Sequence, residues 1–216
     1  MKKVILSISA MLVASISFAQ ANVSAVNQFG IANAAVVTQV GLANDSDVLQ
    51  IGLANLAVVD QDGRRNEADV NQGGALNFAK VDQRNRRNDA YIGQLGIGNA
   101  AFIYQDGRRN DAVIGQAGFL NYARTTQIGR DNSATNFQLG IGNSSNTMQE
   151  GHDNNSLGLQ VVIGTSANVD QFGEYNNAFT IQFGTDNTSY INQFGTANMA
   201  WNVQTGSNPL STVNQW

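Results

Sequence analysis

The sequence predicts an all-β fold, a two-sheet β-solenoid of 11-residue strand-and-arc units with 22 residues per coil and cross-β, amyloid-like stacking. Three observations lead to this prediction. Gln recurs at every eleventh position from Gln28 to Gln215 without an insertion. Gly follows two positions after Gln in 15 of 17 units. Asn, a small residue and a β-branched residue then alternate up to the next Gln. Such regularity is typical of a chain that stacks identical units.

The alternation within each unit predicts the strand. Counting Gln as position 0, Asn at position 5, Ala or Ser at 7, usually Val or Ile at 9 and the next Gln at 11 fall on one face of a strand. The x-Gly-x-x stretch between Gln and Asn is predicted to reverse the chain, because Gly adopts positive φ easily. A helix is excluded, since 11-residue helical repeats need several apolar positions at a spacing of three or four and few glycines.

The amide side chains on this face are the candidate site. A buried amide costs free energy unless it is hydrogen bonded, and stacking identical amides along the axis satisfies them. We therefore expect structural amide ladders. The Gln members are Gln28, Gln39, Gln50, Gln61, Gln72, Gln83, Gln94, Gln105, Gln116, Gln127, Gln138, Gln149, Gln160, Gln171, Gln182, Gln193 and Gln204. The Asn members are Asn33, Asn44, Asn55, Asn66, Asn77, Asn88, Asn99 and Asn110.

The arcs show that one coil contains two units. Arg64-Arg65, Arg86-Arg87 and Arg108-Arg109 lie 22 residues apart, and Arg130 continues the first column. Apolar residues occupy the intervening arcs with the same spacing, so one edge of the stack is predicted to be charged and the other apolar. The acids expected to offset repulsion between arginines ~4.8 Å apart are Asp62, Glu67, Asp89, Asp106 and Asp111. The expected apolar edge contains Leu53, Leu76, Ile97, Phe119, Leu120, Ile141 and Ile163.

The first residues do not belong to the repeat. Lys2 and Lys3 precede an apolar stretch, and Ser17-Phe18-Ala19 has the small–x–small pattern of a cleavage site. This predicts a secretory signal peptide at 1–19 and a repeat domain at 20–216. A membrane anchor is the less favoured alternative, because the apolar stretch is short for a bilayer. Cleavage would leave 10 basic and 16 acidic side chains, and with no Cys the stability must come from hydrogen bonds and stacking.

The unit Gln-x-Gly-x-x-Asn-x-Ala-x3-Gln resembles the curlin repeat, the building block of bacterial curli fibres. Residues 28–39 and 94–105 match it at every defined position, and the resemblance covers essentially all of 20–216. It differs from the family's major subunit in two ways. In the major subunit, alternate half-repeats open with Ser, whereas this chain has Asn in both halves. The major subunit also has a non-repeat export segment after the signal peptide, whereas Asn22 of this chain is already in phase with the repeat.

This resemblance implies a subunit of an extracellular functional amyloid, exported unfolded and assembling end-on into adhesive fibres of the biofilm matrix. The partners it implies are further copies of the chain, a nucleator subunit and an outer-membrane secretion pore. Both the major-subunit role and the nucleator role stay open, and the number of units favours the major one.

No enzyme chemistry is expected. His152 is the only histidine and stands alone in its arc, so we expect no catalytic dyad with an imidazole, and the acids lack the spacing of calcium-binding solenoids. We therefore expect no catalytic residue, no metal, no cofactor and no small-molecule substrate. A net negative charge and few aromatic residues predict no nucleic-acid partner. The alternative function is a monomeric secreted β-solenoid that acts as an adhesin or surface-binding module, and a polysaccharide lyase is a more distant third.

Overall fold

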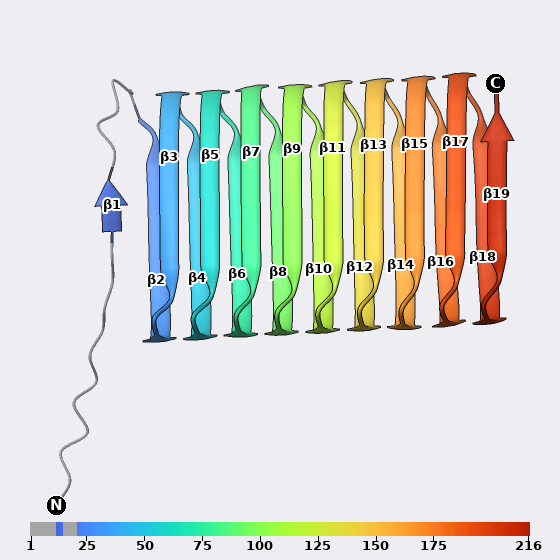
Figure 1. Ribbon diagram of the computed structural model, residues 1–216. Coiled ribbons are helices and arrows are strands. Elements are labelled where there is room, and N and C mark those ends of the chain that lie inside the picture. The colour runs from blue at the N-terminus through green and yellow to red at the C-terminus, as the bar shows by residue number, and fades with distance from the viewer. Residues whose placement is uncertain (1–11, 15–20) are drawn as a thin grey trace, which may run out of the picture.

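The computed structural model describes residues 21–216 in full and the backbone of residues 12–14. All described elements are β-strands, arranged in two parallel sheets of ten and nine strands (Figure 1). None of the described residues belongs to a helix with the length and hydropathy needed to span a bilayer. The predicted signal peptide at 1–19 lies outside the described residues, except for the backbone of β1.

The strands of each sheet are as follows. The ten-stranded sheet contains β1 (Leu12–Ala14), β3 (Ala34–Leu42), β5 (Leu56–Arg64), β7 (Phe78–Arg86), β9 (Ala100–Arg108), β11 (Tyr122–Arg130), β13 (Ser144–His152), β15 (Ser166–Glu174), β17 (Thr188–Thr196) and β19 (Leu210–Gln215). The nine-stranded sheet contains β2 (Val23–Ile31), β4 (Asp45–Leu53), β6 (Glu67–Ala75), β8 (Asp89–Ile97), β10 (Asp111–Phe119), β12 (Ser133–Ile141), β14 (Asn155–Ile163), β16 (Asn177–Thr185) and β18 (Met199–Ser207).

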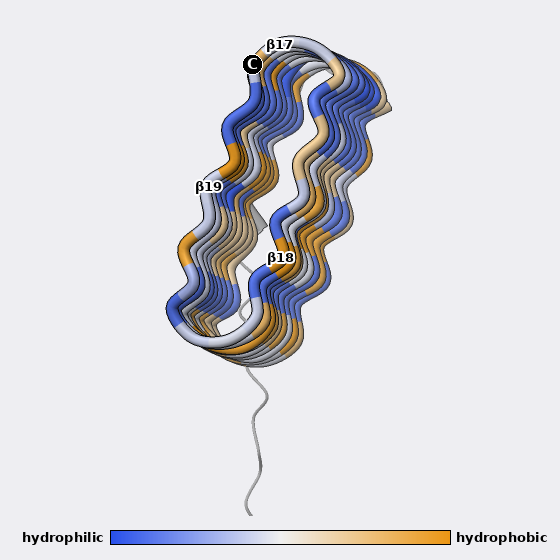
Figure 2. The backbone as a smooth tube through the Cα atoms, turned by 90° about the vertical axis from the view of Figure 1, so that its right-hand side faces the viewer, coloured by the Kyte–Doolittle hydropathy of each residue, from blue (hydrophilic) through white to orange (hydrophobic). Residues whose placement is uncertain are grey.

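Successive strands alternate between the two sheets, so that a pair of strands forms one flattened coil. Figure 2 shows the two sheets facing each other along the whole stack. Each strand pairs in parallel with the next strand but one along the chain, and Gln28 therefore lies beside Gln50, and Gln39 beside Gln61. The strands β2 to β19 make nine such layers. The predicted β-solenoid with 22 residues per coil is confirmed.

The turns are shorter than predicted. Strand pairing continues through the Gly at position 2, and the chain reverses at positions 4 and 5, as at Ala32 and Asn33. The residue at position 4 adopts left-handed φ in every turn, for example 58° at Ala32, 55° at Arg65 and 57° at Tyr175. The sequence gives only a weak signal for this conformation, because seven of the 17 turns have Gly, Asp or Asn at position 4 and the others have Ala, Arg, Leu or Tyr.

The Gly at position 2 is required by the close approach of adjacent layers. Gly30 has φ of 123°, and a Cβ added to it would lie 1.9 Å from the carbonyl oxygen of Gly52. The same contact recurs in the layers above, so a side chain in this column meets a backbone atom that cannot move alone. Val162 breaks this rule with φ of 119°, a conformation that is unusual for a β-branched residue.

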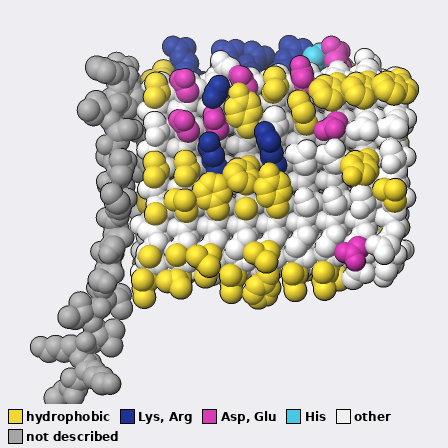
Figure 3. Space-filling view, in the orientation of Figure 1, with side chains coloured by type: hydrophobic (Ala, Val, Ile, Leu, Met, Phe, Trp, Pro, Cys, Tyr) yellow, Lys and Arg dark blue, Asp and Glu magenta, His cyan; other side chains and the backbone are white. Residues whose placement is uncertain are grey.

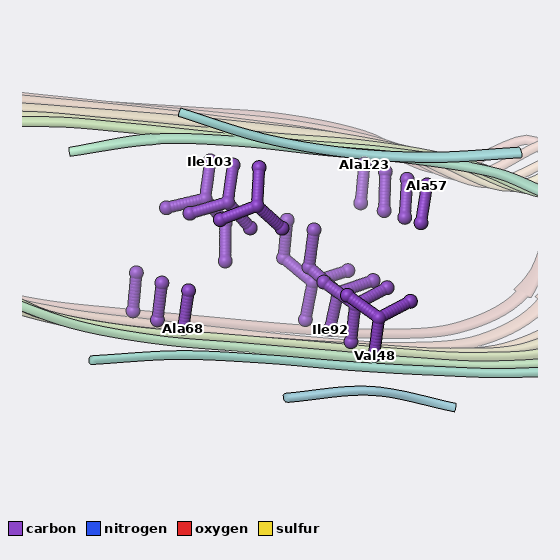
Figure 4. Packing of buried hydrophobic residues seen from close by; sticks show 14 of the residues in the cluster. Val48, Ala57, Ala68, Ile92, Ile103 and Ala123 are labelled. Carbon is purple, nitrogen blue, oxygen red and sulfur yellow. The ribbon is translucent and has the colours of Figure 1, made fainter. Parts of the chain in front are cut away.

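The interior between the sheets is narrow and mostly apolar in the first layers. Ala at position 7 and Val or Ile at position 9 interdigitate there, as Figure 4 shows for Val48, Ile92 and Ile103. Each of these three side chains is almost completely buried. This apolar cluster runs from Ala35 to Ala123, and a second, smaller one begins only at Val169.

A buried polar cluster separates the two apolar clusters. Asn136 Nδ2 donates to the hydroxyl oxygens of Thr125 (3.0 Å) and Thr147 (3.2 Å), and Ser145 Oγ donates to Asn136 Oδ1 (2.9 Å). The next residue in the Asn136 column is Gly158, which adds no side chain. These layers therefore contain less apolar burial. The cluster around Asn136 is hydrogen bonded, whereas Ser156 Oγ, in the strand of Gly158, is buried without a partner among the described residues.

Replacing Val162 by Gly is expected to stabilise the fold. Relief of backbone strain is worth ~1–3 kcal/mol, of which ~0.4–1 kcal/mol is offset by the greater entropy of Gly in the unfolded chain. The matched control is Gly118→Val, two layers away in the same column, where the new Cβ would lie 1.9 Å from the oxygen of Gly140. Guanidinium denaturation should show a higher midpoint for Val162→Gly and a lower one for Gly118→Val. A lower midpoint for Val162→Gly would contradict this account.

Candidate functional site

The Gln side chains form two continuous ladders inside the solenoid, one on each sheet. In each step, Nε2 of one Gln donates to Oε1 of the Gln 22 residues later, over 2.6 Å from Gln28 to Gln50 and 2.8 Å from Gln94 to Gln116. Every step from Gln28 to Gln204 and from Gln39 to Gln215 is present, the last of them at 2.7 and 2.8 Å. Gln50, Gln61, Gln83 and Gln105 have no exposed surface.

The second Nε2 hydrogen of every repeat Gln from Gln39 to Gln215 joins the two sheets, a role that the sequence did not reveal. Gln39 on β3 donates to the carbonyl oxygen of Val23 on β2 (2.8 Å), and Gln94 on β8 donates to Phe78 on β7 (3.0 Å). The donor and the acceptor are separated by 16 residues in both cases. A one-residue slip of any strand would break an axial bond and a bond between the sheets together.

The Asn side chains lie in the turns, and all of them bond to the backbone. In the row from Asn33 to Asn121 each Nδ2 after the first also donates to Oδ1 of the preceding Asn, as expected, whereas the described bonds within the row from Asn44 to Asn110 join side chain to backbone only. Asn44 Nδ2 donates to the carbonyl oxygens of Val40 (3.0 Å) and, in the next layer, Gly63 (3.2 Å). Asn44 Oδ1 accepts from the backbone N–H of Asn66 (3.1 Å). The contact from Asn55 Nδ2 to Asn33 Oδ1 is 3.2 Å. Each Asn therefore fixes its own turn and the following one.

The Asn columns are weakened in the later turns by two substitutions. Thr165 keeps part of the pattern, since its N–H and its hydroxyl both donate to Asn143 Oδ1. Pro209 has no N–H, and the Asn187 Oδ1 beneath it is buried without a partner among the described residues. The missing backbone N–H at Pro209 thus leaves the Asn187 side-chain oxygen of the preceding layer without a donor.

The two ends of the stack differ in their hydrogen-bonding groups. At the first layer, Gln28 and Gln39 present Oε1 atoms that accept no hydrogen bond from the described residues. At the last layer the ladders end on Nε2 of Gln204 and Gln215, and Gln204 Nε2 is held by the carbonyl oxygen of Pro209 (3.1 Å). The outer strands β2, β18 and β19 have one edge without a partner strand, whereas β1 covers Ala35–Val37 of β3. Both ends of the described stack therefore have strand edges without a partner. The stack has a direction, because the ladders end on Oε1 at the first layer and on Nε2 at the last.

The residues expected to form the apolar edge lie along one row of turns. Leu53, Ile97, Phe119, Ile141 and Ile163 share a single column, with Ala75 between the first two. Leu76 and Leu120 lie one residue further along, in the neighbouring column. All seven are exposed, from 43% for Ile97 to 68% for Leu120. Figure 3 shows apolar side chains along this lower edge of the stack.

The opposite edge carries the arginines, and its acids behave differently from our expectation. Among the described residues, only Arg109 of this column forms an ion pair, with Asp131 (2.6 Å). That hydrogen bond lowers the pKa of the Asp131 carboxyl. Asp62, Glu67, Asp89, Asp106 and Asp111, which we expected to offset the repulsion, form no ion pair with the arginines in the described part of the chain. Instead, Arg109 and Arg86 lower the pKa of the Arg108 guanidinium by repulsion.

The described residues contain no cluster of three or more His, Cys, Asp or Glu side chains that could hold a metal ion. His152 contacts Asp153 and Glu174 on the exposed edge, in a column with Arg130. The buried polar groups of the described chain are amides and hydroxyls, and most of them are hydrogen bonded within the stack. The arrangement provides aligned hydrogen-bonding edges.

Removing one amide from the middle of a ladder is expected to cost more than trimming the apolar core. Gln94→Met keeps the apolar volume but leaves Gln72 Nε2, Gln116 Oε1 and the Phe78 carbonyl without their partner, at ~1–3 kcal/mol for each buried group. Ile92→Val, in the same strand, should cost only ~0.5–1.5 kcal/mol. Denaturation midpoints of the two variants measure the difference, and a larger loss for Ile92→Val would show that the ladders contribute little.

The comparison with known families matches this architecture. The profile of the curlin associated repeat matches residues 43–74, 74–107, 107–140 and 166–195. These ranges contain 98 residues in 43–140 and 30 in 166–195, or 128 of 216. The unmatched stretch between them, 141–165, holds Val162, Thr165 and two of the four residues of the buried polar cluster, Ser145 and Thr147. No curated protein matches the chain. The curlin repeat family is structural rather than enzymatic, and this chain belongs to it.

Proposed function

We propose that this protein is a structural subunit of an extracellular, curli-like amyloid fibre that mediates adhesion and aggregation in the biofilm matrix. The observation that carries this proposal is the open, directional stack. Natural solenoids that stay monomeric protect their edge strands, whereas β2, β18 and β19 leave one edge unpaired here. A second copy of the chain carries the complementary edge.

The register within the chain defines how two copies would join. Continuing the 22-residue spacing places β18 of one copy on β2 of the next and β19 on β3. Gln204 Nε2 would then donate to Gln28 Oε1 of the next copy in place of Pro209, and Gln215 Nε2 to Gln39 Oε1. Both amide ladders would continue across the junction with the geometry that they have inside the chain.

Apolar side chains at the two ends support the same junction. Met199 and Leu210 are exposed in the last layer, and Val23 is exposed in the first. In the continued register Met199 lies beside Val23, and Trp216 lies beside Val40. Trp216 already stacks on Phe194 (5.0 Å between ring centroids), so its second face is free for the next copy. Burial of these groups would favour elongation.

The other parts of the proposal follow from the family and from the N-terminus. Secretion would require removal of residues 1–19, leaving the repeat domain at 20–216. Since β1 pairs with Ala35–Val37, this cleavage would also free the edge of β3. A nucleator subunit would present a matching edge, and an outer-membrane pore would export the unfolded chain. The roles of major subunit and nucleator are both compatible with the open ends.

The fibre is tested by assembly of the purified chain 20–216. Thioflavin fluorescence should rise while the protein moves into the sedimenting fraction, and cryo-microscopy should show one layer for every two repeat units. The competing function is a monomeric adhesin or surface-binding module. A chain that stays monomeric and folded at all concentrations tested would favour that function and overturn the fibre.

The exposed apolar edge is expected to cause lateral bundling without being needed for elongation. Leu53→Ser, Ile97→Ser and Ile141→Ser together remove three large side chains from one column, which accepts Ser at Ser207. Contiguous exposed apolar patches usually mark contact surfaces. Electron microscopy should show thin, unbundled fibres that grow at the normal rate.

The control replaces Ile51, Leu95 and Leu139 by Ser on the outer face of the nine-stranded sheet. These side chains are more exposed than Leu53, Ile97 and Ile141, but they do not lie in the turns. This variant should still form bundles. Failure of the edge variant to form any fibre would show instead that the edge residues belong to the elongation surface.

A further inference from the structure

The arginine edge is a concentrated basic feature on an acidic protein. Seven arginines form two adjacent columns on this edge, which we call the basic strip. They are Arg64, Arg65, Arg86, Arg87, Arg108, Arg109 and Arg130. The region 20–216 has only 10 Lys and Arg against 16 acidic residues, and seven of the 10 lie in this strip. Figure 3 shows these cations gathered along the upper edge. Stacking of like charges is unfavourable for the fold, and an anionic partner would lower this repulsion.

The strip contains a hollow that suits an oxyanion. Arg64, Arg65, Arg86 and Arg87 line a pocket of about 160 Å³ together with Leu42. All four guanidinium groups are on the exposed edge, and none of them forms an ion pair with a described residue. A guanidinium presents planar pairs of N–H donors that match carboxylate, sulfate or phosphate groups. An anionic group placed here would relieve the repulsion that four stacked cations create.

Carboxylates on both sides limit the width of the strip. Asp62 and Asp106 lie on the side of the ten-stranded sheet, two residues before the arginines of their own layers, with Arg84 between them in the same column. Glu67, Asp89 and Asp111 form an adjacent column at the start of β6, β8 and β10. The attractive surface is therefore about two side chains wide, and it extends over four layers with a spacing of ~4.8 Å.

We propose that the basic strip binds a linear acidic polysaccharide that runs parallel to the axis of the stack. A thin chain with regularly spaced carboxylate or sulfate groups can contact successive guanidinium groups without meeting the flanking acids. A nucleic-acid duplex is wider and would bring its phosphates close to both rows of carboxylates. Single-stranded nucleic acid gains affinity by stacking on aromatic side chains, and the strip contains only arginines.

Assembly would strengthen this binding, a step that rests on the proposed fibre. Each copy would add one basic strip to the same edge of the stack. A long polysaccharide would then contact many strips at once, and avidity would raise its apparent affinity well above that for one copy. The fibre would in this way bind the acidic polymers of its surroundings along its whole length.

The test compares two variants that remove the same charge. Arg65→Ala with Arg87→Ala removes two pocket arginines, and Ala fits because Ala43 and Ala54 occupy the same turn position with nearly the same φ. Lys80→Asn with Arg124→Asn removes two cations from the outer face of the ten-stranded sheet, in a column where Asn146 and Asn168 occur naturally. Labelled polygalacturonate is the probe, with dextran as the neutral polymer and duplex and single-stranded DNA as competing polyanions.

Polygalacturonate should bind the unmodified chain 20–216 and the Lys80/Arg124 variant alike. The Arg65/Arg87 variant should bind it at least ~10-fold more weakly, with a salt dependence reduced by about two ions. Equal loss in both variants, or tighter binding of either DNA than of polygalacturonate, would overturn the proposal. Sedimentation of each sample without polymer reports fibre formation separately, and fluorescence anisotropy on unassembled chain measures the strip even if no fibre forms.

Discussion

The axial stacking of identical side chains, each on its counterpart one coil away, is the constraint on which the rest of the structure depends. Each interior Gln amide bonds to the same amide in the layers above and below it, and buried amides need such partners. The ladders then fix the register of every strand, and the bonds between Gln and the opposite sheet fix the distance between the sheets. The apolar core is small, since Ala occupies about half of its positions.

This arrangement explains why the chain tolerates a polar interior. In a globular core, Thr125, Asn136 and Thr147 would need partners from unrelated parts of the sequence. In a stack, the same position of the adjacent strand is always close, so that one polar residue can be matched by another 11 residues away. Because of the same coupling, a substitution in one layer affects the adjacent layer. Pro209, for example, leaves Asn187 Oδ1 without a hydrogen-bond donor in the described part of the chain.

The sequence predicted the features that depend on recurring side-chain types. It did not show the features that depend only on the backbone. The 22-residue coil could be read from the alternation of Arg-bearing and apolar arcs, and the inward face from the spacing of Asn, Ala, Val and Gln. The bond from Gln39 to Val23 could not, because a backbone carbonyl carries no sequence signal. The two-residue turn was also mostly hidden, since Arg65, Leu76 and Tyr175 give no indication that they adopt positive φ. The acids near the arginines were expected to offset the repulsion between them, but among the described residues only Asp131 forms an ion pair with an arginine of that edge.

The left-handed residue in each turn has a kinetic consequence. For a non-glycine residue this conformation is locally unfavourable, by about 1–2 kcal/mol, and an isolated unit has nothing to offset it. Only an existing layer, with its amides and edge strand already in place, supplies the bonds that make the turn favourable. Starting a coil is therefore slow while extending one is fast. In the fibre that we propose, the end of a finished stack would supply that first layer to the next copy, so growth at an existing end would be faster than a new start.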